Sequence, residues 1–180
     1  AIVGINFIIG IIGINAVVAA SLVVNAPATV PNTANLTIVD AARRLRDGSL
    51  TSVALTEACL ARIARDNDRL KAFILVTAET ARAEAAAADR ELANGQDRGA
   101  LHGIPIAIKD IVDIEGLATT CGSRVREEHV AEKDAVVVAH LRRAGAVITG
   151  KTNLHEFAMG TTSEDSAYGA ARHPLDDTRS

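Results

Sequence analysis

Lys109 is the residue of this chain whose type and position most favour chemistry. It ends an apolar run, Ile106-Ala107-Ile108, that predicts a β-strand, and α/β proteins place reactive side chains at the carboxyl ends of strands. Alternation along a strand puts Lys109 on the side of Ala107, away from the two isoleucines. Partial burial disfavours a charged ammonium, so a lysine in this position could serve as a general base near neutral pH.

A structural role for Lys109 is the alternative. The stem of the side chain would then lie along apolar surface, with the ammonium in water or paired with the adjacent Asp110. Composition and spacing alone leave both interpretations open.

No other group of residues predicts a metal, cofactor or nucleotide site. The histidines are scattered and lack the spacing of metal ligands, so we expect neither a metal nor a cofactor. The run Gly150-Lys151-Thr152 has the composition of a phosphate loop, but a hydrophobic strand precedes it where a cradle of amides would be needed. Three serines lie near glycines, and no local pattern marks any of them as an activated nucleophile: Ser123, Ser163 and Ser166.

Alternating strand and helix patterns surround Lys109. Periodicity and capping residues predict helices at 41–47, 52–66, 78–94 and 135–144, and strands at 72–76, 106–112 and 146–149. Ser52, Thr77 and Asp134 are the expected N-caps of the last three helices. The alternation predicts an α/β fold whose sheet contains parallel strand pairs.

Composition excludes several classes of protein. The chain has 180 residues, with 19 basic and 22 acidic side chains and a net charge of −3, so the basic excess of a nucleic-acid binder is missing. Its two cysteines, Cys59 and Cys121, are too few for a disulfide-rich secreted scaffold. Whether these two form a bond depends on their distance in space, which spacing along the chain does not decide.

The charges are distributed unevenly, because the first charged residue is Asp40. Residues 1–24 are almost entirely apolar and, as a helix, would be about 36 Å long, enough to cross a membrane. Residues 25–35 have the composition of a linker. We expect 1–24 to be a signal peptide or membrane anchor, giving an exported or membrane-associated protein. A buried strand or helix is the alternative, and a cytoplasmic location would then follow.

Several long motifs in register resemble the amidase signature family. They cover residues 102–110, 119–123, 145–160, 161–169 and 172–176, and the resemblance extends over about 36–180. It implies the N-terminal portion of that family's fold, a mixed β-sheet covered by helices. It also implies that Lys109 is the lysine of a Ser–cis-Ser–Lys triad that hydrolyses a carboxamide to a carboxylate and ammonia or an amine.

The same resemblance identifies Ala158-Met159-Gly160 as the stretch that lines the family's substrate cleft, with a plain turn as the alternative. The family's Gly/Ser-rich block, which carries both triad serines, would begin just after Ser180. We therefore expect the chain to correspond to the first part of an amidase, and to be inactive by itself because a base without its nucleophile cannot carry out covalent catalysis.

Two other functions remain open. One is the glutaminase subunit of a tRNA-dependent amidotransferase, whose partners would be an acylated tRNA and a second subunit. The other is a non-catalytic module. For the preferred amidase, the expected partners are a small-molecule amide, a membrane through residues 1–24 and a second copy in a homodimer, with no direct nucleic-acid binding.

Overall fold

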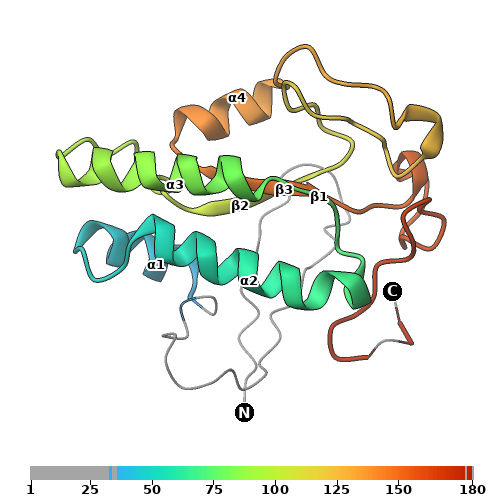
Figure 1. Ribbon diagram of the computed structural model, residues 1–180, viewed down its shortest axis with the longest axis horizontal. Coiled ribbons are helices and arrows are strands. Elements are labelled where there is room, and N and C mark those ends of the chain that lie inside the picture. Colours follow the sequence, from blue (N-terminus) through green and yellow to red (C-terminus); the bar gives the residue numbers. More distant parts are fainter. Residues whose placement is uncertain (1–32, 34–35, 177, 180) are drawn as a thin grey trace.

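The computed structural model describes residue 33, residues 36–176 and residues 178–179 (Figure 1). The predicted signal or anchor segment, and most of the predicted linker, lie outside the described residues. Among those residues, no helix is both long and apolar enough to cross a membrane. The membrane contact expected of residues 1–24 therefore remains a prediction.

Four α-helices follow the predicted order, with shifted ends. They are α1 (Ile38–Arg46), α2 (Ser52–Leu70), α3 (Ala78–Ala93) and α4 (Val136–Arg143). Helix α1 begins three residues earlier than predicted because the Thr37 hydroxyl accepts a hydrogen bond from the Asp40 amide at 3.0 Å. Helix α2 continues four residues past its predicted end. Figure 1 shows α2 and α3 running side by side.

The predicted caps at Ser52 and Asp134 are not formed, whereas Thr77 is the N-cap residue of α3, as predicted, but makes no capping hydrogen bond. Thr51 caps α2 instead, and the Ser52 hydroxyl donates to a carbonyl just before the second strand at 2.7 Å. The Thr77 hydroxyl donates to a carbonyl of the third strand at 2.9 Å. The Asp134 carboxylate pairs with Arg142 at 2.9 Å. All three side chains hold one element against another, a tertiary use that local sequence does not reveal.

A mixed three-stranded sheet forms the centre of the described part. Its strands are β1 (Phe73–Val76), β2 (Pro105–Lys109) and β3 (Val147–Thr152), in the order β1–β3–β2. Strand β3 pairs parallel with β2, as predicted, and antiparallel with β1. Strand β2 stops three residues earlier than predicted, because the Val112 amide turns back to the Lys109 carbonyl at 3.0 Å. Strand β3 runs three residues further than predicted.

Helices cover both faces of this sheet. Ile106 and Ile148 belong to a buried cluster that includes Val138 of α4 and Leu45 of α1. On the other face, Val147 packs with the small side chains Ala81 and Ala85 of α3. The predicted class, an α/β fold with a mixed sheet covered by helices, is confirmed.

The central strand contains a β-bulge that changes which side chains face which layer. Ile148 pairs with Ile106, but Gly150 rather than Thr149 pairs with Ala107, so one residue of β3 is unpaired. A shift of one residue moves all later side chains to the opposite face. Beyond the bulge, Lys151 therefore pairs with Ile108 and shares its face.

Gly150 makes this close packing of the strands possible. Its φ is +150°, and a Cβ there would lie 2.2 Å from the carbonyl oxygen of Leu75 in β1. Both the backbone conformation and the neighbouring strand therefore require glycine.

We predict that Gly150→Ala lowers the free energy of unfolding of the complete protein by about 3 kcal/mol, because β1 must shift and the backbone is strained. Gly116→Ala is the matched control: φ is +76° and nothing lies within 4 Å of the added methyl group. It should cost about 1 kcal/mol. Equal losses for the two variants in urea-induced unfolding would contradict the prediction.

Candidate active site

Lys109 is the last residue of β2 and is half-buried. Its backbone is held from two sides: it pairs with Thr152 of β3, and its carbonyl accepts the Val112 amide. Within the described residues, its ammonium has no hydrogen-bond or ion-pair partner. The lysine is thus fixed at its backbone and free at its amine.

Asp110 does not serve as the counter-ion of Lys109. Its side chain is buried, and Oδ1 lies 2.8 Å from the ammonium of Lys151. Oδ2 accepts the Thr120 amide at 3.0 Å and also the Thr120 hydroxyl. Oδ1 has no aligned hydrogen bond, so its charge is balanced by the Lys151 ammonium alone. The alternative in which Asp110 pairs with Lys109 is wrong, because this carboxylate is already taken.

Lys151 is the largest fully buried side chain of the described part, with 0% of it exposed. Its ammonium donates to the Ala118 carbonyl at 2.9 Å and to the Thr119 hydroxyl at 3.0 Å, in addition to its contact with Asp110. Two hydrogen bonds and one ion pair thus surround the ammonium and supply the partners that a buried charge needs. Sequence reasoning considered Lys151 only as part of a phosphate loop and missed its structural role. The available signal was a charged residue two positions after the apolar run 146–149.

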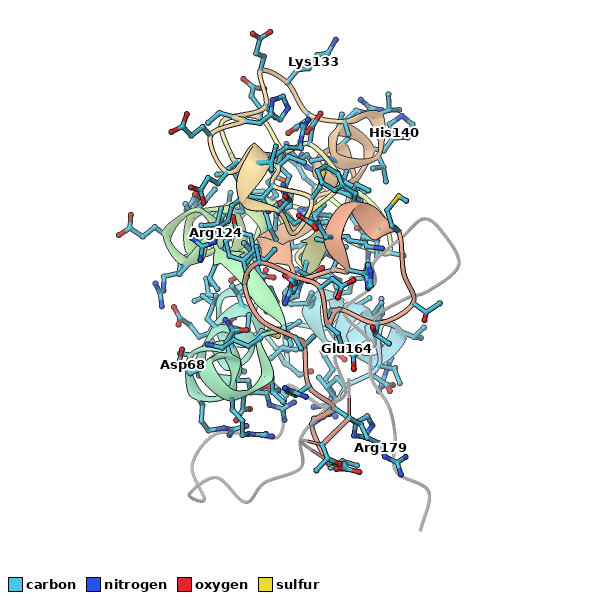
Figure 2. The ribbon with its side chains drawn as sticks, turned by 90° about the vertical axis from the view of Figure 1, so that its right-hand side faces the viewer. Asp68, Arg124, Lys133, His140, Glu164 and Arg179 are labelled. Atoms are coloured by element: carbon cyan, nitrogen blue, oxygen red, sulfur yellow. The ribbon has the colours of Figure 1, made fainter. Side chains whose placement is uncertain are left out.

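Two long loops gather at the carboxyl ends of β2 and β3. Residues 110–135 and 153–176 lie at the right-hand end of the molecule in Figure 1, and Figure 2 looks onto that end. Two backbone hydrogen bonds connect them to the end of β2: the Cys121 amide donates to the Asp110 carbonyl at 2.9 Å, and the Phe157 amide donates to the Cys121 carbonyl at 2.8 Å. Lys109 and the predicted substrate-lining stretch are therefore brought to one corner of the fold.

Ala158-Met159-Gly160 follows a short 3-10 helix, η3 (Glu156–Ala158). Ala158 is exposed, and Met159 is 85% exposed, so its thioether side chain is available for contact. Gly160 lies under the imidazole of His155, whose Cε1 would be 2.3 Å from an added Cβ. The stretch is thus packed against His155 at Gly160 and open to solvent at Ala158 and Met159.

Left-handed backbone at non-glycine residues is concentrated in these loops. Cys121, Phe157 and Ala158 have φ values of 56°, 51° and 56°. Such conformations cost energy and occur mainly where surrounding structure enforces them, often at functional sites. Here the backbone hydrogen bond between Cys121 and Phe157 joins two of the three.

The serines near glycines are engaged in structural hydrogen bonds. Ser166 donates its hydroxyl to the buried Asn153 at 2.6 Å, and Ser163 accepts the Ala171 amide at 2.7 Å. The Ser123 hydroxyl accepts the Val125 amide at 3.3 Å. These contacts hold the loops in place, and none of them links a serine to Lys109.

Both cysteines are free thiols. Burial raises the pKa of the Cys59 thiol to about 11, with Arg62 opposing the shift. Desolvation also raises the pKa of Cys121, and the negative charge of Asp110 adds to that effect. A raised pKa suppresses the thiolate, so neither residue has the character of a nucleophile. In the described part of the chain, no set of three His, Cys, Asp or Glu side chains could hold a metal ion.

The Amidase family profile matches residues 54–180, well over half of the sequence. The chain belongs to the amidase family. This agrees with the resemblance of its motifs, and it places Lys109, Asp110 and Lys151 within the region that the family shares.

Curated relatives of this amidase chain include a glutamyl-tRNA(Gln) amidotransferase subunit of Roseiflexus sp. (strain RS-1). The two are 48% identical over 139 residues, which cover 77% of this chain and 28% of that protein. The corresponding protein of Desulfotalea psychrophila is 47% identical with the same coverage. The chain thus spans less than a third of the length of these relatives.

Solved amidase structures share the fold. Native peptide amidase from Stenotrophomonas maltophilia superposes with a TM-score of 0.72 at 40% identity, over 79% of this chain and 31% of that one. Fatty acid amide hydrolase gives a TM-score of 0.76 at 21% identity, over 81% of this chain and 26% of that one, a likeness of fold alone.

We predict that alkylation of Cys59 by iodoacetamide continues to accelerate between about pH 9 and pH 11, because the folded thiol retains its proton there. In the unfolded chain the rate should reach half of its maximum near pH 9.0, the ordinary pKa of a cysteine thiol, and in the folded protein only near pH 11. Since the folded pKa is the higher one, the associated stability is present below pH 9 and is lost as the pH rises through 11. A rate for the folded protein, followed by mass spectrometry, that reaches half of its maximum near pH 9 would contradict this.

Proposed function

We propose that the protein containing these 180 residues hydrolyses a carboxamide, and that Lys109 is the proton carrier of its active site. The observation that carries the proposal is a half-buried lysine whose only acidic neighbour along the chain is already paired with another lysine. An amine without a counter-ion can be neutral and accept a proton, whereas a paired ammonium cannot.

The proposed reaction is a Ser–cis-Ser–Lys relay. One serine would attack the amide carbon while its proton passes through the second serine to the neutral amine of Lys109. The protonated lysine would return that proton to the departing nitrogen, releasing ammonia or an amine. Water then hydrolyses the acyl-serine to a carboxylate. The serines near glycines in this chain make structural hydrogen bonds and do not contact Lys109. We therefore assign both triad serines to the part of the relatives' length that this chain does not span.

We further propose that Ala158-Met159-Gly160 contacts the substrate. Backbone hydrogen bonds connect this stretch through Cys121 to Asp110, next to Lys109, and Met159 exposes a flexible apolar side chain. A thioether adapts to irregular apolar groups, which suits the part of an amide beyond its reacting carbon.

A second candidate is the glutaminase subunit of a tRNA-dependent amidotransferase. The names of the curated relatives, at 47–48% identity, support it. The chemistry at Lys109 would be the same, with glutamine as the amide and ammonia passed to an acylated tRNA on a second subunit. For the first candidate, an amidase without a partner subunit, the sequence predicts a homodimer and a membrane contact. Observing either of them would favour that candidate.

Replacing Lys109 tests the proton carrier. In the complete protein, Lys109→Met should lower kcat for amide hydrolysis by about 10³-fold, because the relay loses its base while the volume is retained. Lys133→Met is the matched control, since Lys133 is exposed and projects away from the molecule in Figure 2. Unchanged turnover in Lys109→Met, measured as ammonia release, would refute the assignment.

Replacing Met159 tests the contact with the substrate. Met159→Ala should raise KM about 5-fold for amides with bulky apolar groups, because buried apolar area is lost. It should leave acetamide turnover unchanged. Val136→Ala removes a similarly exposed apolar side chain from α4 and serves as the control. Equal effects on bulky and small amides would contradict the proposed contact.

Ammonia release from glutamine distinguishes the two candidates. A free-standing amidase should act on simple amides without a partner, whereas a glutaminase subunit should require its partner protein and prefer glutamine. If the complete protein releases ammonia from no amide in either condition, the proposed function is wrong.

A further inference from the structure

We propose that the buried Asp110–Lys151 pair is a positioning device for Lys109: it holds the end of β2 and keeps the Asp110 carboxylate away from the Lys109 amine. Asp110 and Lys151 act through Lys109 and do not themselves touch the substrate. The inference rests on the proposed function of Lys109, and it adds a role for two residues whose charges are fully enclosed.

The bulge in β3 decides which lysine meets Asp110. Asp110 follows Lys109 directly, so strand alternation turns the two side chains to opposite faces. Because one residue of β3 is unpaired, Lys151 faces the same side as Ile108, which is also the side of Asp110. Without the bulge, the lysine of β3 would lie on the face of Lys109 and leave Asp110 unpaired.

A closed ring of contacts locks the pair. Lys151 binds Asp110 and the Thr119 hydroxyl, while the next residue, Thr120, holds the other carboxylate oxygen through its amide and hydroxyl. All four side chains are at most 5% exposed. Water therefore does not compete for the carboxylate, and the side chain cannot swing toward Lys109 without breaking several buried contacts.

The same ring fixes the backbone that carries Lys109. The Asp110 amide donates to the Thr152 carbonyl at 3.0 Å, and the Asp110 carbonyl accepts the Cys121 amide at 2.9 Å. The aspartate is thereby held at its amide, its carbonyl and its carboxylate. A rigid residue directly after Lys109 limits the directions in which the amine can point, which is how a proton carrier is aligned.

Charges of both signs gather at this corner. Asp110, Lys151, Asp113 and Arg126 all act on the nearby Cys121, two of them negative and two positive. Asp110 and Lys151 lie 2.8 Å apart, so their opposite charges largely cancel beyond the pair. Removing one member leaves an uncompensated buried charge next to the end of β2.

The test compares Asp110→Asn, Lys151→Met and the double variant. A lone Lys151 ammonium repels a proton from Lys109, so Asp110→Asn should lower the pH at which Lys109 becomes neutral by about one unit. A lone Asp110 carboxylate attracts it, so Lys151→Met should raise that pH by a similar amount. In the double variant, the charge effects cancel and the midpoint should return to that of the parent.

The direct readout is acetylation of Lys109 by acetic anhydride as a function of pH, quantified by mass spectrometry in the complete protein. Only the neutral amine reacts, so the midpoint reports on Lys109 whether or not the protein turns over an amide. Arg142→Met is the control, because it breaks a half-buried ion-pair network on α4 and should lower stability without moving this midpoint.

If a single variant does not fold, Thr120→Val takes its place. It removes the hydroxyl hydrogen bond to the Asp110 carboxylate, which leaves the negative charge less compensated, and should move the midpoint upward. Midpoints that coincide with that of the parent in every folded variant would overturn the inference, and would show that the pair is merely structural.

Kinetics separate this inference from the proposed function. In an active parent, both single variants should reduce kcat at least about 10-fold with little change in KM, and the acidic limb of the pH profile should shift as the labelling midpoint does. If activity requires Lys109 but the pH profile of these variants equals that of the parent, only the positioning role is refuted. Activity that survives Lys109→Met refutes the proposed function itself.

Discussion

A buried ammonium against a buried carboxylate is the constraint around which this part of the fold is arranged. Enclosing Lys151 and Asp110 is unfavourable unless nearly every lone pair and proton finds a partner. The structure meets that requirement with a carbonyl from Ala118 and with the side chains of Thr119 and Thr120. These partners come from the loop after β2, so satisfying the two charges also determines the path of that loop across the strand ends.

The β-bulge in β3 is the geometric feature that allows these two charges to meet. The bulge turns Lys151 inward, and Gly150 accepts the close approach of β1 that accompanies it. A regular ladder would bury Thr149 and Lys151 differently and leave Asp110 without a counter-ion. The sheet is thus locally irregular, and this irregularity produces a defined polar core next to Lys109.

The layout of the fold could be predicted from sequence, whereas the polar core could not. Strong periodicity indicated the four helices and three strands, and the motifs indicated the family and drew attention to Lys109. The caps at Ser52 and Asp134 were wrong because the Ser52 hydroxyl donates to the Gly103 carbonyl and the Asp134 carboxylate accepts the Glu115 amide and pairs with Arg142. The partner of Asp110 was likewise hidden, since it depends on a one-residue shift in a strand 41 positions away. Local sequence patterns encode the preferences of single helices and strands, whereas pairings between distant side chains are decided by tertiary packing.

The contact between His155 and Gly160 has an evolutionary consequence for the loop that carries Met159. No side chain can be added at position 160 without displacing the imidazole, whereas the neighbouring thioether meets little but solvent. The tip of the loop can therefore vary freely while its base stays the same. Under the proposed contact with substrate, selectivity would diversify at Met159 with little cost to folding.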